Sequence, residues 1–217
     1  MIPQLKDVDS IIFDMDGTLW DATESYARVW NETCSQFGIN TFFTGKELAP
    51  YMGMSIDDIL IHLLGGNLPM DKKVFMDVLF KNESILMPKL GGILFSGVKE
   101  GLEMIHRHYR MFMLSNCSAR GLKNFVLFTK TEMLFEGLLS QGERPASKSE
   151  NLAYMIDRYS LKVPVYVGDT QADCDQAHLA GIPFVFTEYG FGKCYNADWQ
   201  YNTPDSMFNA FLAAKCQ

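Results

Sequence analysis

Apolar residues recur along the chain with two periods, and each period predicts a different element. Short continuous apolar runs predict buried strands, whereas apolar residues spaced three and four apart predict helices with one buried face. The predicted strands are Ile11–Phe13, Met111–Leu114, Leu138–Ser140, Val163–Asp169 and Phe184–Thr187. The predicted helices are Asp21–Phe37, a short one within Gly45–Tyr51, Ser55 to Gly65-Gly66, Asp71–Leu86, Val98–Tyr109, Ser118–Thr129, Lys148–Tyr159, Ala172–Ala180 and Pro204–Ala214.

The order of these elements predicts the fold class. From residue 92 onward strands alternate with helices, which favours a parallel sheet with helices on both faces. The first strand belongs to the same sheet, whereas residues 20–91 contain predicted helices and no strand. We therefore predict an α/β fold, in which residues 1–19 and 92–217 form a Rossmann-like, doubly wound parallel sheet. Residues 20–91 form an inserted α-helical domain.

The composition restricts the class of partner. The net charge of −7 argues against a nucleic-acid or anionic-membrane surface, because those partners need clusters of basic residues. No run approaches the roughly 20 apolar residues that cross a bilayer, and the first ten residues lack the apolar core of a signal peptide. The five cysteines form no CxxC pair and are expected to be the reduced thiols of a cytoplasmic protein.

Four aspartates stand at the carboxyl ends of two predicted strands, the edge where open parallel sheets place their functional sites. Asp14 and Asp16 follow the first strand, and Asp169 and Asp173 follow "VPVYVG". Buried carboxylates are costly unless a cation lies among them, and hard oxygen ligands suit Mg²⁺. Taken singly, these aspartates could equally form turns and helix caps.

Two further groups suit an anion at the same edge. Ser115 and Asn116 follow the strand Met111–Leu114 and precede a predicted helix, whose first N–H groups could bind an anion. Lys148 is a lone cation at the start of another predicted helix. The alternative interpretations are helix capping for the first pair and an ordinary surface position for the lysine.

The set of motifs resembles the haloacid dehalogenase-like hydrolase superfamily over nearly the whole chain. The motifs that carry the resemblance are Asp14-Met15-Asp16-Gly17-Thr18, Ser115-Asn116, Lys148 and Gly168-Asp169-Thr170-Gln171-Ala172-Asp173. The helical insertion resembles the α-helical cap of the phosphoglycolate phosphatase and β-phosphoglucomutase branch. The segments "AHLAG" at 177–181 and "TEYGFG" at 187–192 are also similar to that branch.

The resemblance implies a role for each motif residue. Asp14 is the expected nucleophile that forms an aspartyl-phosphate, and Asp16 is the expected general acid and base. The expected Mg²⁺ ligands are Asp14, the main-chain carbonyl of Asp16, and Asp169, with Asp173 supporting them. Ser115, Asn116 and Lys148 are expected to hold the transferring phosphoryl oxygens. The expected substrate is a small phosphorylated metabolite, and the sequence leaves monomer and homodimer open.

Two positions depart from the family pattern. Ser149 follows Lys148 where the family usually has proline, so Lys130 and Lys162 stay open as alternative cations. Tyr26 stands where β-phosphoglucomutases have a histidine, which favours a phosphatase over a phosphosugar mutase. A non-catalytic member that binds a ligand or a partner is a third hypothesis.

Two expectations concern the helical domain. The loop Tyr51–Ser55 matches the place where this branch reads its substrate, although a simple turn between helices explains it equally well. Trp20 and Trp30 are expected to pack inside the helical domain and to make no ligand contact.

Overall fold

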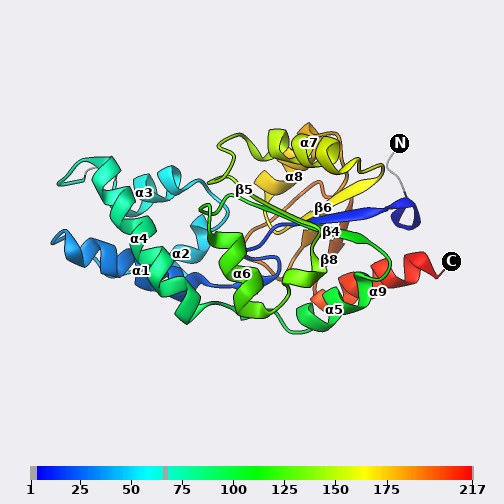
Figure 1. Cartoon of the computed structure of the whole chain (residues 1–217), viewed down its shortest axis with the longest axis horizontal. Helices are drawn as coiled ribbons and strands as arrows, with labels where there is room; N and C mark the ends of the chain where they lie inside the picture. The colour runs from blue at the N-terminus through cyan, green and yellow to red at the C-terminus, as the bar shows by residue number, and fades with distance from the viewer. Residues whose placement is uncertain (1–3, 66–67, 217) are drawn as a thin grey trace. The chain divides into compact units, whose positions relative to one another are not determined.

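A computed structural model describes residues 4–65 and 68–216, and the predicted helix end at Gly66 lies outside these residues. The chain divides into two compact units. The larger unit joins the chain up to Asp21 with the chain from Leu94 onward, and the other unit is Ala22–Ile93. Figure 1 traces the order of the elements in each unit.

A six-stranded parallel sheet forms the centre of the larger unit, with the strand order β5-β4-β1-β6-β7-β8. The strands are β1 (Ser10–Phe13), β4 (Arg110–Ser115), β5 (Gly137–Ser140), β6 (Pro164–Gly168), β7 (Phe184–Thr187) and β8 (Trp199–Tyr201). All four residues of β1 are buried, as expected for a strand covered on both faces. The order runs outward from β1 in both directions, so β1 lies at the switch point where such folds bind their ligands.

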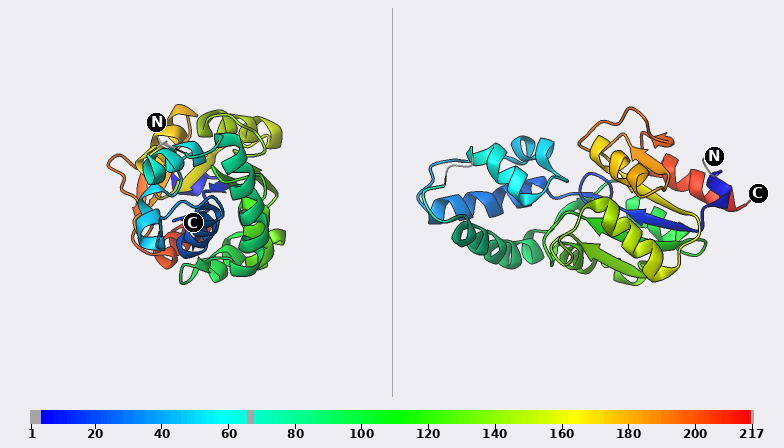
Figure 2. Two further views of the ribbon diagram at one scale, coloured as in Figure 1. Left: turned by 90° about the vertical axis from the view of Figure 1, so that its left-hand side faces the viewer. Right: turned by 90° about the horizontal axis from the view of Figure 1, so that it is seen from above.

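Helices cover both faces of this sheet, as Figures 1 and 2 show. On one face lie α7 (Lys148–Tyr159) and α8 (Gln171–Leu179). On the other lie α5 (Val98–Ile105), α6 (Gly121–Thr129) and α9 (Pro204–Lys215). Short 3-10 turns occur at η1 (Leu5–Asp7) and η3 (Glu132–Leu134). The prediction of an α/β fold with a doubly wound parallel sheet is confirmed.

The second unit is helical, and its elements are α1 (Thr23–Gln36), α2 (Gly45–Leu48), η2 (Ala49–Tyr51), α3 (Ile56–Leu64) and α4 (Lys72–Leu90). Two of these helices, α3 and α4, begin at side-chain caps, because Ser55 and Asp71 each accept a backbone N–H of the first turn. The Trp30 and Phe75 rings pack together with centroids 6.0 Å apart, so Trp30 is a packing residue of this unit as predicted.

A separate two-stranded sheet pairs β2 (Trp20–Asp21) with β3 (Ile93–Leu94), where the chain leaves and re-enters the larger unit. The prediction missed β2 and β3, which have two residues each and show no periodicity. It also missed β8, whose three residues "WQY" are only partly buried and lack an apolar run. The helix α4 continues past its predicted end at Leu86 and ends at Leu90. Pro88 is tolerated because it lies in the last turn, where a missing N–H donor disrupts few helical hydrogen bonds.

The predicted helix Ser118–Thr129 begins three residues late, at Gly121. The backbone explains the difference. Gly121 N–H donates to the Ser118 carbonyl in a turn, and Gly142 N–H donates to the Cys117 carbonyl. These backbone groups are therefore used outside the helix ladder.

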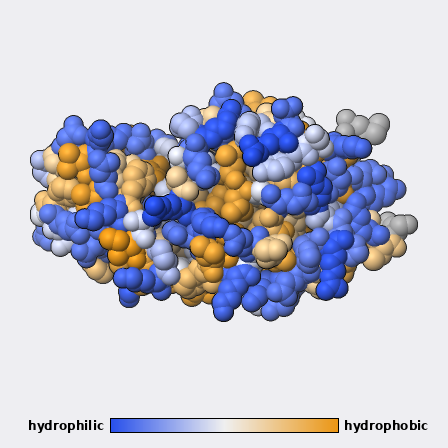
Figure 3. Space-filling view, viewed as in Figure 1, coloured by the Kyte–Doolittle hydropathy of each residue, from blue (hydrophilic) through white to orange (hydrophobic). Residues whose placement is uncertain are grey.

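On the face shown in Figure 3 hydrophobic residues form separate patches among hydrophilic ones. Within the described ranges no helix is both long enough and apolar enough to cross a membrane. The five cysteines, all of which are described, are free thiols.

Candidate active site

The carboxyl edge of the sheet gathers polar side chains from three neighbouring strands. Asp14 follows β1, Ser115 ends β4, and Asp169 follows β6. Each of these residues is buried, and so is Asp173 in the first turn of α8. Buried polar side chains cost free energy unless they are paired, so their convergence at one edge points to a binding or catalytic role.

Three of the predicted aspartates form a potential metal site. Asp14, Asp169 and Asp173 each offer a carboxylate oxygen, and these atoms all lie within 4.8 Å of one another. All three side chains are buried, and every donor is a hard oxygen. This donor set fits Mg²⁺, which binds few carboxylates and retains water that a phosphate can replace.

Lys148 is a buried residue of the same cluster. It is 5% exposed, and its Nζ lies 3.2 Å from Asp14 Oδ1 and 2.5 Å from Asp173 Oδ1. It is the first residue of α7, whose start is fixed by a capping box between Ser147 and Glu150. The surface-lysine interpretation is therefore wrong.

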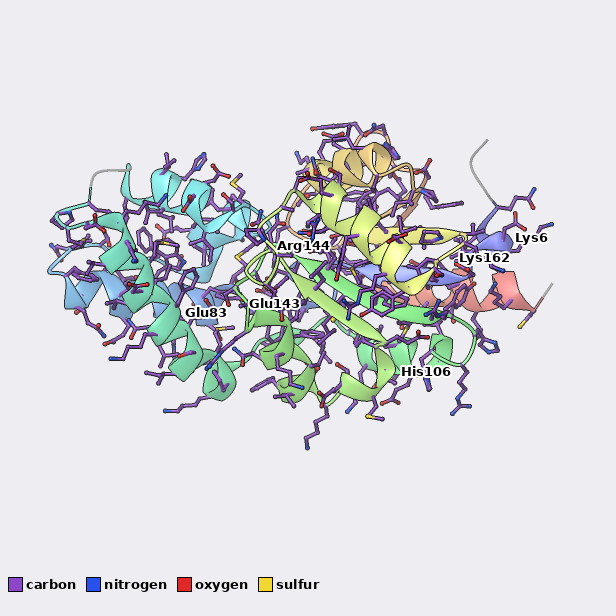
Figure 4. The ribbon with its side chains drawn as sticks, turned by 45° about the horizontal axis from the view of Figure 1, so that its top comes forward. Lys6, Glu83, His106, Glu143, Arg144 and Lys162 are labelled. Atoms are coloured by element: carbon purple, nitrogen blue, oxygen red, sulfur yellow. The ribbon has the colours of Figure 1, made fainter. Side chains whose placement is uncertain are left out.

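The two alternative cations lie elsewhere. Lys130 and Lys162 are both exposed. Figure 4 shows Lys162 beside the start of β6, at the end of that strand opposite to Asp169. Of the three lysines, Lys148 is the one that contacts the aspartates.

Burial and mutual repulsion change the proton affinities of this cluster. Burial is the main cause that raises the pKa of Asp14, to about 6. The charge of Lys148 opposes this rise, and the charge of Asp173 adds to it. Burial also raises the pKa of Asp169 well above its ordinary value, and the Asp173 and Asp14 charges add to the rise. Burial alone lowers the pKa of Lys148, but the two carboxylates outweigh it and raise that pKa. The cluster thus holds more negative charge than one lysine neutralises, which favours a divalent cation.

Asp16 lies on a tight turn that leaves β1. Its Oδ1 accepts a hydrogen bond of 2.9 Å from the indole Nε1 of Trp20, and Gly17 N–H donates to the Trp20 carbonyl. Gly17 has a φ of +78°, and a Cβ there would lie 2.1 Å from Asp169 Oδ2. Glycine is therefore required both by the backbone conformation and by the close approach of Asp169.

Ser115 is the last residue of β4, the strand next to β1, and Asn116 follows it at the same edge of the sheet. Ser115 is buried, Asn116 is partly buried, and the Ser115 Oγ accepts a 3.4 Å hydrogen bond from Cys117 N–H. Because α6 begins at Gly121, the pair does not immediately precede a helix N-terminus. The expected helix start directly after this pair is therefore wrong, whereas the expected anion contact of Ser115 and Asn116 stays a prediction.

Comparison with known proteins identifies the family. A family model described as "Haloacid dehalogenase-like hydrolase" matches residues 11–187. The chain belongs to the haloacid dehalogenase-like hydrolase family. The predicted resemblance is confirmed, and with it the expectation that the chain is an enzyme.

Named relatives of this hydrolase are phosphoglycolate phosphatases. The protein from Pasteurella multocida is 25% identical over 214 residues, which cover 92% of this chain and 93% of the relative. The one from Colwellia psychrerythraea is 24% identical and covers 96% of each chain.

Solved structures share the fold. A structure titled a predicted phosphatase from Clostridium acetobutylicum has a TM-score of 0.78 at 17% identity and covers 95% of this chain and 99% of that one. A structure titled a predicted phosphoglycolate phosphatase from Haemophilus somnus has a TM-score of 0.76 at 21% identity, covering 93% of this chain and 97% of that one.

The sequence analysis did not identify Trp20 and Phe191 as residues of the hydrolase site. Trp20 was expected inside the helical domain, but it lies in the larger unit, where its ring meets Phe125 edge-on at 4.9 Å and its N–H holds Asp16. The signal was its spacing, because a tryptophan four residues after Asp16 can reach back across a tight turn.

The second missed residue is Phe191, whose backbone N–H donates a 2.7 Å hydrogen bond to Asp169 Oδ2. It lies on the loop after β7, which Tyr189 also ties to the first motif through a 2.9 Å hydrogen bond to the Thr18 carbonyl. The segment "TEYGFG" was noted for its resemblance to the family, but sequence alone does not show that its backbone orients a carboxylate.

Proposed function

We propose that this hydrolase is a Mg²⁺-dependent phosphatase, which hydrolyses a small phosphate monoester through an aspartyl-phosphate on Asp14. The observation that supports the proposal is the buried cluster of Asp14, Asp169 and Asp173 with Lys148 against two of the three. A nucleophilic carboxylate and a phosphate are both anions, and their approach needs positive charge on either side.

The proposed metal ligands are Asp14, Asp169 and the main-chain carbonyl of Asp16, with Asp173 supporting them. When bound, Mg²⁺ supplies the charge that lets the carboxylate and the phosphoryl group approach each other. The hydrogen bond from Phe191 N–H keeps one oxygen of Asp169 oriented, in the way outer partners orient metal ligands.

The reaction proceeds in two displacements. An oxygen of Asp14 attacks phosphorus, the bond from phosphorus to the ester oxygen breaks, and Asp16 gives its proton to the departing alcohol. Asp16 then takes a proton from a water that attacks the same phosphorus, which releases inorganic phosphate and regenerates Asp14. Lys148 and the Ser115-Asn116 pair hold the phosphoryl oxygens, where negative charge increases in each transition state.

The names of the relatives suggest the substrate. Phosphoglycolate is the first candidate because the curated relatives are phosphoglycolate phosphatases, and small sugar phosphates are the next.

We further propose that residues 20–91 act as a cap domain that excludes water during turnover, and that the enzyme acts in the cytoplasm. The loop Tyr51–Ser55 is the proposed reader of the substrate, and Met54 in it is 38% exposed. Met54→Arg should then change the ranking of substrates, and unchanged kinetics on every ester would contradict this role.

The test is phosphate release from a panel of small phosphate esters, in Mg²⁺ and in EDTA, for wild type and Asp14→Asn. The proposal expects turnover that disappears with EDTA and with the substitution. Release that persists in Asp14→Asn would contradict the nucleophile. Conversion of β-glucose 1-phosphate to the 6-phosphate faster than phosphate release would make the chain a mutase, although Tyr26 replaces the histidine of that class.

A further inference from the structure

A tyrosine hydroxyl lies directly against the proposed nucleophile. Tyr166 is in β6 and pairs in the sheet with Ile12, two residues before Asp14. Two strand residues span about 6.6 Å, and a tyrosine side chain that leans along the strand covers that distance. The phenol therefore starts inside the core and ends at the site.

The contacts of Tyr166 converge on one oxygen. Its side chain is fully buried, and its hydroxyl lies 3.3 Å from Asp14 Oδ1 and 3.1 Å from the Leu114 carbonyl. The Lys148 Nζ lies 5.5 Å from the centroid of the same ring and 3.2 Å from the same Asp14 Oδ1. Lysine and tyrosine thus contact a single carboxylate oxygen from two neighbouring elements, α7 and β6.

We propose that Tyr166 is a positioning residue for the nucleophile, which fixes the rotation of the Asp14 carboxylate and places the Lys148 ammonium beside it. The phenol has one proton, and a carboxylate is a stronger acceptor than a backbone carbonyl. Rotation of the carboxylate would break both contacts to Oδ1 together, so Oδ2 stays turned away from this pair. The electron-rich ring face also attracts the ammonium. This role rests on the proposed function, because it matters only if Asp14 attacks phosphorus.

The test compares Tyr166→Phe with Tyr109→Phe. Tyr109 is the matched control, because its hydroxyl is also buried in the larger unit and also donates to a backbone carbonyl, that of Phe211 at 2.8 Å. For Tyr166→Phe we expect kcat to fall about tenfold, the size expected for losing a long hydrogen bond to a charged group. The KM and the half-saturating Mg²⁺ concentration should stay within about twofold of wild type, and so should every kinetic constant of Tyr109→Phe.

A second readout does not need turnover. Beryllium fluoride with Mg²⁺ mimics a phosphorylated aspartate, and its binding to Tyr166→Phe should weaken more than its binding to Tyr109→Phe. Thermal unfolding of both variants reports the structural cost of a lost buried hydroxyl, which we expect to be similar for the two.

The outcomes separate the two proposals. Equal kinetics and equal beryllium fluoride binding in Tyr166→Phe and Tyr109→Phe would overturn the positioning role while the phosphatase stands. A rise in KM with unchanged kcat would also overturn it, and so would failure of Tyr166→Phe alone to fold. If the wild type itself shows no turnover that depends on Mg²⁺ and Asp14, the proposed function fails and this inference with it.

Discussion

Replacing Lys148 by methionine removes the cation that pairs with Asp14 and Asp173 in the metal-free protein. Methionine has a similar length and is apolar, so the change removes charge with little loss of volume. The Nζ lies 3.2 Å from one carboxylate oxygen and 2.5 Å from the other. At an effective dielectric constant of about 20, a pair at the longer distance gains about 5 kcal/mol of Coulomb energy before desolvation is subtracted.

Desolvation offsets part of that gain, but in this variant the carboxylates remain buried after their partner has gone. Removing one member of a buried pair costs about 3–5 kcal/mol for that reason. We therefore expect the free energy of unfolding of metal-free Lys148→Met to fall by about 3–5 kcal/mol at pH 8. In a chain of this size each kcal/mol lowers Tm by about 2–4 °C. Mg²⁺ should restore part of the loss, because it supplies the missing charge.

The assay is urea unfolding of wild type, Lys148→Met and Lys162→Met, each in EDTA and in Mg²⁺. Lys162→Met is the matched control, because Lys162 is exposed and lies at the other end of β6. Phosphate release should fall at least 100-fold in Lys148→Met, the usual effect of removing one group that stabilises transition-state charge. If the two variants unfold within about 0.5 kcal/mol of each other, the pairing has no energetic weight and the reasoning fails.

Three further changes test other parts of the site. Gly17→Ala places a Cβ 2.1 Å from a metal-site carboxylate oxygen, so the Mg²⁺ affinity measured by calorimetry should collapse. Gly38→Ala is the control, because Gly38 also has a positive φ but a Cβ there meets no atom within 4 Å. The control should lose only about 1–2 kcal/mol of stability. Trp20→Phe removes the hydrogen bond to Asp16, and kcat should fall about tenfold with KM unchanged; equal kcat would show that the indole only packs. The pKa of Asp14 is raised from 3.8 to about 6. Between these two pH values the metal-free folded state keeps a proton that the unfolded state has lost. The free energy of unfolding of the metal-free protein should therefore fall by about 3 kcal/mol as the pH rises from 4 to above 6. Asp14→Asn should flatten that dependence in EDTA, and an unchanged slope would contradict the assignment.

The sheet and the acidic residues were predictable because their signals are local. Ile11–Phe13 is a continuous apolar run that ends in two aspartates, and a parallel strand must bring that end to the carboxyl edge of the sheet. The apolar runs at β4 and β6 also end in polar residues, so the sequence predicted that Ser115 and Asp169 lie at the same edge.

What the sequence left open or missed depends on contacts between distant segments. Lys148 is 134 residues from Asp14, and nothing in its own neighbourhood distinguishes a buried site lysine from a surface one. In the sequence, Tyr166 looks like one more apolar residue of a predicted strand. The position of its hydroxyl depends on the register of β6 against Ile12, which the sequence does not show. The start of α6 shifted because Gly142, beyond the next strand, competes for the backbone of Cys117. Helix propensity depends on neighbouring residues and therefore does not predict a hydrogen bond between two distant loops.

The central claim is that Asp14 becomes phosphorylated during turnover. The direct measurement uses Asp16→Asn, which should form the aspartyl-phosphate from an activated ester but lack the base that activates water. After rapid quenching, intact-mass spectrometry and peptide mapping should find one phosphoryl group on Asp14, removable by hydroxylamine, and none in Asp14→Asn. A turning-over wild type whose quenched Asp16→Asn variant has no phosphoryl group, or has it on another residue, would contradict the account.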